Sequence, residues 1–314
     1  MCIRDSFVNQ TLDPTRCTPW VPTEDVFDAD SNPDGLRCTI FEAMEASLGT
    51  DPETGFANRP LDNTGVQYGL GALLSNEISA EDFLTLNREI GGFDSGGQVV
   101  SERNNSSAEV IQRAYESGRI LGGHGLAEIP IVVLRANLDA SGDVHTLGWA
   151  SAVRERIEAA NGSSNLVTWT SIDSSAASLE RRALIAIDEW LVAAGASEGT
   201  IDAETLTASR PEAVDDLCTE AGNLLASGAA TFAEGSACSE RALDSLEPRL
   251  VAGAPASNHI LKCALAPVAD FDYAGTLSAE DIAALQTIFP EGVCDYGEPG
   301  VGVVPPAETW ATYN

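Results

Sequence analysis

The chain has 314 residues, 44% hydrophobic and 21% charged, an ordinary globular composition at a length typical of about two domains. Its 17 basic and 48 acidic residues give a net charge of −31, so its surface repels nucleic-acid phosphates and anionic lipid headgroups. We therefore expect no nucleic acid and no membrane among its partners. Lys262 is the only lysine. An acidic surface almost without lysine fits marine or halophilic surroundings, where counterions screen its self-repulsion.

The first ten residues contain no apolar stretch of the kind that a secretory signal needs. They open with Met-Cys-Ile-Arg-Asp-Ser, which resembles a spurious start on reading frames assembled from environmental sequence. We expect residues 1–10 to be spurious or disordered. We also expect the chain to be a C-terminal fragment whose true N-terminus lies upstream.

Seven cysteines are present, and none has the short Cys/His spacing of a zinc site, so disulfides are the better interpretation. With Cys2 set aside, proximity along the chain favours three pairs, although other connectivities and buried free thiols stay open: Cys17 with Cys38, Cys218 with Cys238, and Cys263 with Cys294. Disulfides form in oxidising compartments, which predicts a secreted, extracellular or periplasmic protein.

Residues 11–64 are rich in Pro, Asp, Asn and Thr and predict a segment dominated by loops. Ser79 and Ser278 each open the tetrapeptide Ser-Ala-Glu-Asp ahead of apolar residues, which is typical of a helix N-cap. A further short helix is expected within residues 104–121. After Gly199 the composition predicts helical pieces, and from Pro290 a tail that wraps the surface.

Residues 28–35 place oxygen-bearing side chains at alternate positions ahead of a glycine, as a calcium loop requires. Asp30, Asn32 and Asp34 are the candidate ligands. The pattern is incomplete, since the twelfth position counted from Asp30 is Phe41, where a bidentate Glu is expected. A turn rich in Asp, Asn, Pro and Gly explains the same residues. Calcium is the one ion that the sequence suggests, and no cofactor is required.

The stretch 129–195 predicts an open α/β sheet. The apolar run at 129–134 is typical of a strand buried on both faces, and residues 165–172 form a second strand. Amphipathic helices are expected around Trp149 to Ile157 and from Leu179 to Gly195. The order strand, helix, strand, helix makes the strands parallel. Because two strands do not form a stable sheet, we expect the partner strands before residue 1.

The loop that leaves the first strand carries Asp139, Asp143 and His145. In open α/β sheets the site lies beyond the carboxyl ends of the strands, so this loop is the best candidate. An acid there orients an imidazole that acts as general base. The alternative is that both acids make turn hydrogen bonds and His145 caps the following helix. His124 and His259 are interpreted as structural.

A Gly-x-Ser-x-Gly sequence occurs at 195–199, with Ser197 in the nucleophile position. A nucleophile elbow needs a strand before the motif and a helix after it. Here the preceding residues end an amphipathic helix, so we interpret the motif as a helix C-cap.

Three segments together carry a family resemblance: 62–70 (Asp-Asn-Thr-Gly-Val-Gln-Tyr-Gly-Leu), 129–157 with Gly-Asp-Val-His at 142–145, and 249–296 from Arg-Leu-Val-Ala-Gly-Ala-Pro to Phe-Pro-Glu-Gly-Val-Cys-Asp-Tyr. They resemble a family of secreted bacterial α/β-hydrolase-type proteins that is distantly similar to tannases and feruloyl esterases. The resemblance implies the C-terminal part of an α/β-hydrolase: a lid or insertion at 11–128, core strands and helices at 129–199, and a helical and loop extension at 200–314.

The resemblance also implies hydrolysis of an ester or related acyl bond in a small substrate, with the nucleophilic serine upstream. The family order Ser, Asp, His places the acid at Asp139. No histidine follows the second strand, where the hydrolase pattern has one. Either His145 supplies the imidazole from the same loop as Asp139, or the residue roles differ, or the lineage is not a triad hydrolase. We take His145 as the candidate base and expect the fragment alone to be inactive. The alternative from another class is a non-catalytic extracellular binding module, stabilised by calcium, on a hydrolase-like scaffold.

Overall fold

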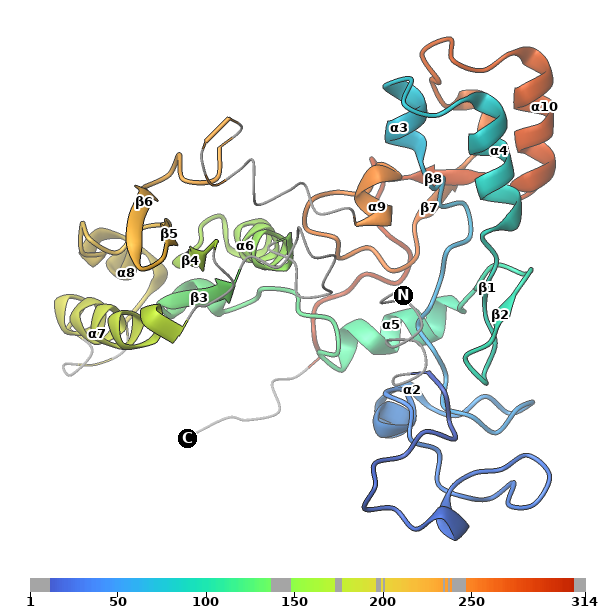
Figure 1. The fold of residues 1–314 in the computed structure, drawn as a ribbon, viewed down its shortest axis with the longest axis horizontal. Coiled ribbons are helices and arrows are strands. Elements are labelled where there is room, and N and C mark those ends of the chain that lie inside the picture. The colour runs from blue at the N-terminus through green and yellow to red at the C-terminus, as the bar shows by residue number, and fades with distance from the viewer. Residues whose placement is uncertain are drawn as a thin grey trace. The chain divides into compact units, whose positions relative to one another are not determined.

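The computed structural model describes residues 12–136, 148–172, 177–195, 199, 201–233, 235, 236, 238 and 247–307. The chain divides into two compact units (Figure 1). Unit 1 comprises residues 1–120, 248–255 and 260–314, and unit 2 comprises 121–247 and 256–259. The segment after residue 247 thus packs mainly with the first 120 residues, while the boundaries expected at 128 and 199 stay a prediction about a lid and a core.

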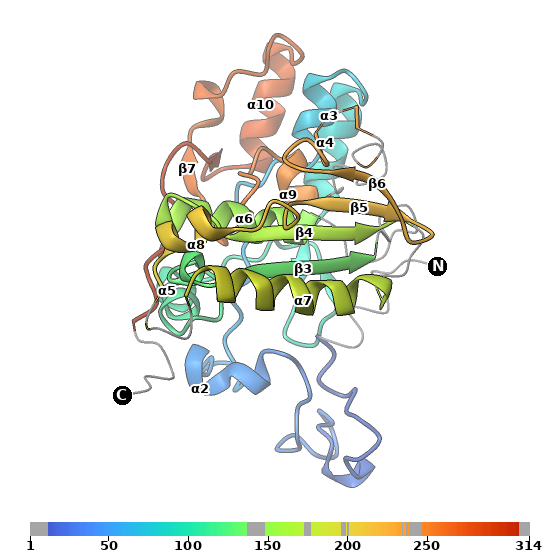
Figure 2. The same ribbon diagram turned by 90° about the vertical axis from the view of Figure 1, so that its left-hand side faces the viewer.

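Unit 2 contains a four-stranded sheet in the order β3-β4-β5-β6, built from β3 (Ile131–Ala136), β4 (Leu166–Ser171), β5 (Leu217–Glu220) and β6 (Asn223–Ser227). β3, β4 and β5 run parallel, and β6 pairs antiparallel with β5. Figure 2 shows the four strands in this order from bottom to top. The mixed α/β class and the parallel strands predicted from 129–172 are confirmed.

The expectation that the partner strands precede residue 1 is wrong for one side of the sheet. β5 and β6 supply the further strands, and they lie downstream of β4. They occupy a stretch for which the composition predicted helical pieces. Only α8 (Ala203–Ser209) and α9 (Pro248–Val251) are helical among the described residues between Gly199 and Pro255. β3 is the edge strand on the other side, with no further partner strand in the described part of the chain.

Helices on both faces bury the centre of the sheet of unit 2. The expectation that the first strand is buried on both faces is wrong, because β3 is an edge strand and is only half-buried, and β6 is mostly exposed. Val167 and Trp169 of β4 pack with α7 (Ala177–Ala193), where Trp190 is fully buried. Leu166 packs on the other face against α6 (Gly148–Asn161), through Ile157. Successive strand residues point to opposite faces. This alternation explains why β4 reads as a continuous apolar and hydroxyl-bearing run, and why all six of its residues are buried.

Unit 1 packs its helices around apolar clusters. α3 (Leu70–Leu74), α4 (Ala80–Glu89) and α10 (Ala279–Ile288) share one cluster that includes Phe83 and Leu285. Ser79 and Ser278 cap α4 and α10 with complete capping boxes, as predicted. The other helices of unit 1 within the described residues are α2 (Glu45–Leu48), α5 (Ala108–Glu116) and α9, with 3-10 turns at Thr23–Asp25, Glu42–Met44 and Val268–Asp270. A further 3-10 turn, Leu126–Glu128, belongs to unit 2.

Two small antiparallel ladders complete unit 1: β1 (Gly92–Phe93) with β2 (Val99–Val100), and β7 (Ala264–Ala266) with β8 (Val293–Asp295). β8 corrects the expectation of a surface tail from Pro290, because Val293 and Cys294 are buried. Val293 buries an apolar side chain and Cys294 forms a disulfide with Cys263, and both contacts hold this part of the chain in the core.

Three disulfides join the cysteine pairs that chain proximity favours: Cys17–Cys38, Cys218–Cys238 and Cys263–Cys294. They indicate an oxidising, extracellular environment. Among the helices that the structure describes, none has the length and apolar character needed to cross a bilayer.

Candidate functional site

The predicted catalytic loop begins at the carboxyl edge of the parallel strands in unit 2. β3 ends at Ala136, which pairs with Ser171 at the end of β4, and Ser171 pairs in turn with Thr219 of β5. Three parallel strands therefore end side by side, which is where open α/β sheets bind ligands. Asp139, Asp143 and His145 follow Ala136 in the chain but lie outside the described residues, as does Ser197. Their roles stay predictions.

The ends of β4 and β5 at this edge are buried. Thr170, Ser171 and Thr219 are each at most 1% exposed. The Thr219 hydroxyl donates to the Thr170 carbonyl at 3.3 Å, and the amide of Ile172 donates to the Thr219 carbonyl at 2.9 Å. These contacts hold the ends of β4 and β5 in one register.

A buried ion pair fastens α6, the helix that follows the predicted loop, to the sheet. Both terminal nitrogens of Arg154 donate to the Asp216 carboxylate, at 2.8 and 2.5 Å. Asp216 also accepts the backbone amide of Thr168 at 2.7 Å. Burial by itself lowers the pKa of the Arg154 guanidinium, but the hydrogen bond and charge of Asp216 outweigh it and raise that pKa. The pair fixes where α6 lies on the sheet.

The two described histidines are not at this edge. His124 is exposed on the loop that precedes β3. His259 is half-buried, with its Nδ1 2.7 Å from the Ser257 hydroxyl, and Arg156 donates to the Ser257 and Asn258 carbonyls at 2.6 Å each. Burial, helped by the charge of Arg156, lowers the pKa of His259. The contact spans only two residues and stabilises a turn.

The candidate calcium loop is organised by its own hydrogen bonds. One carboxylate oxygen of Asp28 accepts the amides of Asp30 and Ser31 and the Ser31 hydroxyl, at 3.1, 2.7 and 2.7 Å. The Asn32 amide nitrogen donates to the carbonyls of Glu24 and Val26 at 3.0 Å each. Asp30 and Asp34 are exposed. Within the described ranges no three His, Cys, Asp or Glu side chains gather as metal ligands, and calcium at Asp30, Asn32 and Asp34 stays a prediction.

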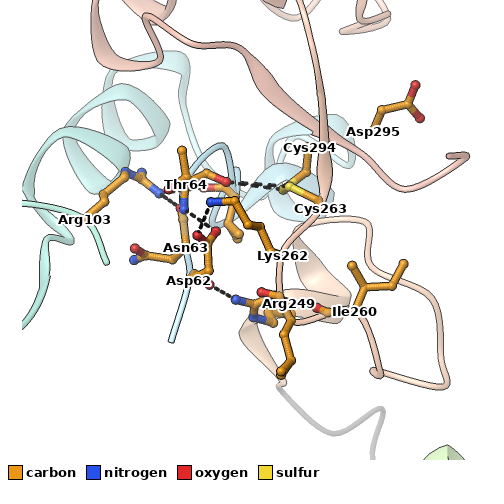
Figure 3. Close-up of a disulfide and its surroundings, with 12 residues drawn as sticks. Asp62, Asn63, Thr64, Arg103, Arg249, Ile260, Lys262, Cys263, Cys294 and Asp295 are labelled. Atoms are coloured by element: carbon orange, nitrogen blue, oxygen red, sulfur yellow. Dashed lines mark hydrogen bonds and ion pairs between the residues drawn. A yellow bond between two sulfur atoms is a disulfide. The ribbon is translucent and has the colours of Figure 1, made fainter. Parts of the chain in front are cut away.

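Sequence reasoning missed a polar core in unit 1 that is centred on Asp62 (Figure 3). The Asp62 carboxylate accepts the Lys262 ammonium at 2.6 Å and the backbone amides of Thr64 and Ser106 at 3.1 and 3.2 Å. Its carbonyl accepts a guanidinium hydrogen bond from Arg249. Burial raises the pKa of Asp62 more than Lys262 and the other donors lower it. The signal in the sequence that could have indicated this core is Lys262, the only lysine of an acidic chain.

Arg103 forms a second buried cationic centre beside this core. One terminal nitrogen donates to the carbonyls of Asn63 and Val66 at 2.8 and 2.9 Å, and the other to the Asn87 carbonyl at 2.8 Å. Its guanidinium lies 4.6 Å from the ring centre of Phe289. Burial disfavours the charged guanidinium and is the main cause that lowers the pKa of Arg103. The carbonyl oxygens take the place of water as its hydrogen-bond acceptors. Both centres tie the segment 62–70 to distant parts of unit 1.

Comparison with known proteins agrees with the resemblance carried by the three sequence segments. A family model for tannase-like proteins matches residues 1–305, nearly the whole chain. No curated protein and no solved structure matches the chain. The chain belongs to the Tannase-like family of unknown function (DUF6351).

Proposed function

We propose that the chain carries the acid and the base of a serine-type hydrolase that cleaves ester bonds in a small substrate. Asp139 orients His145, and His145 activates a serine supplied by sequence upstream of residue 1. One observation carries this proposal. In this chain of the tannase-like family, three parallel strands end side by side at the edge where the sequence with Asp139 and His145 begins. That edge is the usual position of catalytic loops in open α/β sheets.

In the proposed reaction, His145 transfers protons in both the acylation and the deacylation step. His145 removes the serine proton as the serine oxygen attacks the ester carbonyl carbon. The tetrahedral intermediate collapses with loss of the alkoxide, which takes the proton from His145 as it leaves. Water then gives a proton to the same imidazole and attacks the acyl carbon. The acyl group is released as a carboxylic acid, and the serine oxygen leaves with the proton from His145. Asp139 stabilises the imidazolium in both halves of the reaction, and no cofactor takes part.

The absence of histidine after β4 supports His145 as the base. The residues that follow β4 read Ile172, Asp173, Ser174 and Ser175, and those that follow β5 read Ala221 and Gly222. Neither stretch supplies an imidazole. Within this edge, the loop after β3 is the source of both an acid and a histidine.

The first test is to recover the upstream coding sequence, produce the extended protein, and assay short p-nitrophenyl esters. The upstream frame is expected to contain a strand, a Gly-x-Ser-x-Gly elbow and a helix. His145→Ala and Asp139→Asn should each lower kcat by about 10³-fold or more, because loss of a triad member removes the general base or its orientation. His124→Ala is the matched control, since it removes an exposed imidazole of the same unit.

The outcomes separate the parts of the proposal. Turnover that collapses in His145→Ala but persists in His124→Ala supports the proposed base. An upstream elbow with normal turnover in His145→Ala keeps the hydrolase and rejects the site. An extended protein with no elbow and no turnover contradicts the hydrolytic function itself.

A further inference from the structure

A cavity of about 480 Å³ lies within unit 1, where the segment 62–70 meets the end of α10. Its volume is in the range typical of small-molecule sites, about 300–1,000 Å³. The inner wall is formed by residues of two of the family-like segments, of α4 and of the loop after β2: Thr64, Gly65, Asn87, Arg103, Phe289 and Gly292. The proposed hydrolytic site uses none of these residues.

The inner wall is held rigidly. The Gly65 carbonyl accepts the Cys294 amide at 2.9 Å, and a Cβ at Gly65 would approach Leu265 to 2.4 Å. Asn87 exchanges two hydrogen bonds with the backbone of Tyr68, at 2.9 and 2.8 Å. The nearby disulfide fixes Cys294 to Cys263 (Figure 3). A wall preorganised in this way lowers the entropy lost when a ligand binds.

The rim differs from the wall because most of its polar side chains have no hydrogen-bond partner among the described residues. Within the part of the chain that the structure describes, the side chains of Arg88, Ser101, Glu102 and Glu291 make no hydrogen bond or ion pair with protein. The amide oxygen of Asn105 accepts a hydrogen bond from the Lys262 ammonium at 2.7 Å, and its amide nitrogen is left to donate to a ligand. The rim therefore presents a guanidinium, two carboxylates, a hydroxyl and an amide that can bond a ligand.

The charges and shapes of these groups select the ligand. Two arginines and two glutamates line the cavity, so their charges sum to zero, although the net charge of the chain is −31. This local balance of charge favours a neutral ligand. Intermixed donors and acceptors suit adjacent hydroxyl groups, each of which both donates and accepts. Phe289 is the one aromatic residue of the lining, is 4% exposed and is covered by Arg103, so it offers no ring face to a planar aromatic ligand.

We propose that this cavity is a binding site for a neutral saccharide unit, built from residues that the proposed hydrolytic site does not use and independent of whether the chain catalyses ester hydrolysis. The hydroxyl groups of the sugar contact the rim side chains, and its carbon skeleton lies against Ile288 and Pro290. The function is attachment of unit 1 to a sugar-bearing molecule outside the cell, in keeping with the disulfides.

The test uses the chain itself, titrated with methyl β-D-glucopyranoside while protein amide resonances are followed by NMR. Galacturonate and glucosamine are the anionic and cationic probes. We expect saturable shifts with the glucoside at millimolar concentration, and weaker binding of both charged sugars. Arg88→Ala and Glu102→Ala should each weaken binding about tenfold, since each loses a hydrogen bond to a charged group. Glu89→Ala is the control, because it removes an exposed charge beside Arg88 that does not line the cavity.

Three results would overturn the proposal. The first is no saturable shift with the glucoside. The second is equal affinity in the parent, Arg88→Ala and Glu102→Ala proteins, which would place binding elsewhere. The third is tighter binding of galacturonate or glucosamine, which would contradict the charge balance. Because the variants change exposed side chains, their folding can be verified by the unchanged resonances of α5 and α10, which contain none of the changed residues.

Discussion

At the residue scale, the pairing of Asp62 with Lys262 explains why a chain almost free of lysine keeps one. The Asp62 side chain is 1% exposed and that of Lys262 is 18% exposed, with 2.6 Å between their charged atoms. A buried carboxylate without a cation is strongly unfavourable, so loss of one partner costs far more than the pair itself contributes. The pair therefore acts as a specific connection between residues 200 positions apart in the sequence.

Lys262→Met should lower the free energy of unfolding of unit 1 by about 3–5 kcal/mol at pH 7, because it leaves the Asp62 carboxylate buried and unpaired. Burial already raises the pKa of Asp62, and loss of Lys262 raises it further. An acid with a raised pKa binds protons more tightly when folded, so the deficit is full above that pKa and shrinks as pH falls through it. Urea unfolding of parent and variant at pH 7 and pH 4 measures this.

Lys262→Arg is the matched control, since it keeps a cation near Asp62. A deficit in Lys262→Met that stays the same at both pH values would mean that lost packing, and not the buried charge, is responsible.

At the element scale, local signals predicted the helix starts well. Ser79 and Ser278 each accept the amide of the third helical residue, at 3.1 and 3.2 Å, and Asp82 and Asp281 return the bond. The hydrogen bonds from the serines lower the pKa of both aspartates. Such boxes depend on a few adjacent residues, which is why they can be found in a sequence.

Ser278→Ala should lower the free energy of unfolding of unit 1 by about 1 kcal/mol, because one amide at the start of α10 loses its acceptor. Ser278→Asp should recover most of that loss, since its carboxylate can accept the same amide. Guanidinium unfolding of the three proteins tests the cap. Equal stability of parent and Ser278→Ala would show that α10 is held by its apolar face alone.

The β5–β6 hairpin shows where local signals failed. Its turn places Ala221 at φ 48° and Gly222 at φ 78°, both in the left-handed region. Two-residue hairpin turns favour Asn-Gly or Asp-Gly there, and alanine is an unfavourable choice. The sequence Glu-Ala-Gly-Asn therefore looks like the end of a helix, while pairing with β4 makes it the end of a strand.

At the scale of the whole molecule, each disulfide lies within one compact unit. Cys218–Cys238 belongs to unit 2, and Cys17–Cys38 and Cys263–Cys294 belong to unit 1. Each unit also has its own apolar clusters. Units with separate cores can unfold separately.

Replacement of both Cys263 and Cys294 by serine should lower the stability of unit 1 by about 3 kcal/mol, because the unfolded chain regains the freedom of the loop that the disulfide closes. The transition of unit 2 should not move. The Cys218→Ser, Cys238→Ser double variant is expected to shift only the transition of unit 2. Calorimetry resolves the two transitions, and a single transition displaced by both double variants would contradict independent unfolding.

The sequence by itself determined the features that depend on neighbouring residues: the capping boxes, the parallel strands β3 and β4 with α6 between them, the favoured cysteine pairs, and the tannase-like family. Periodicity and capping act over a few residues, so they leave a local record. Only the tertiary structure decided that β5 extends the sheet beyond β4, that β8 is buried, and that Asp62 pairs with Lys262. These contacts join distant segments, and the burial of apolar and charged groups selects them, which no local pattern encodes.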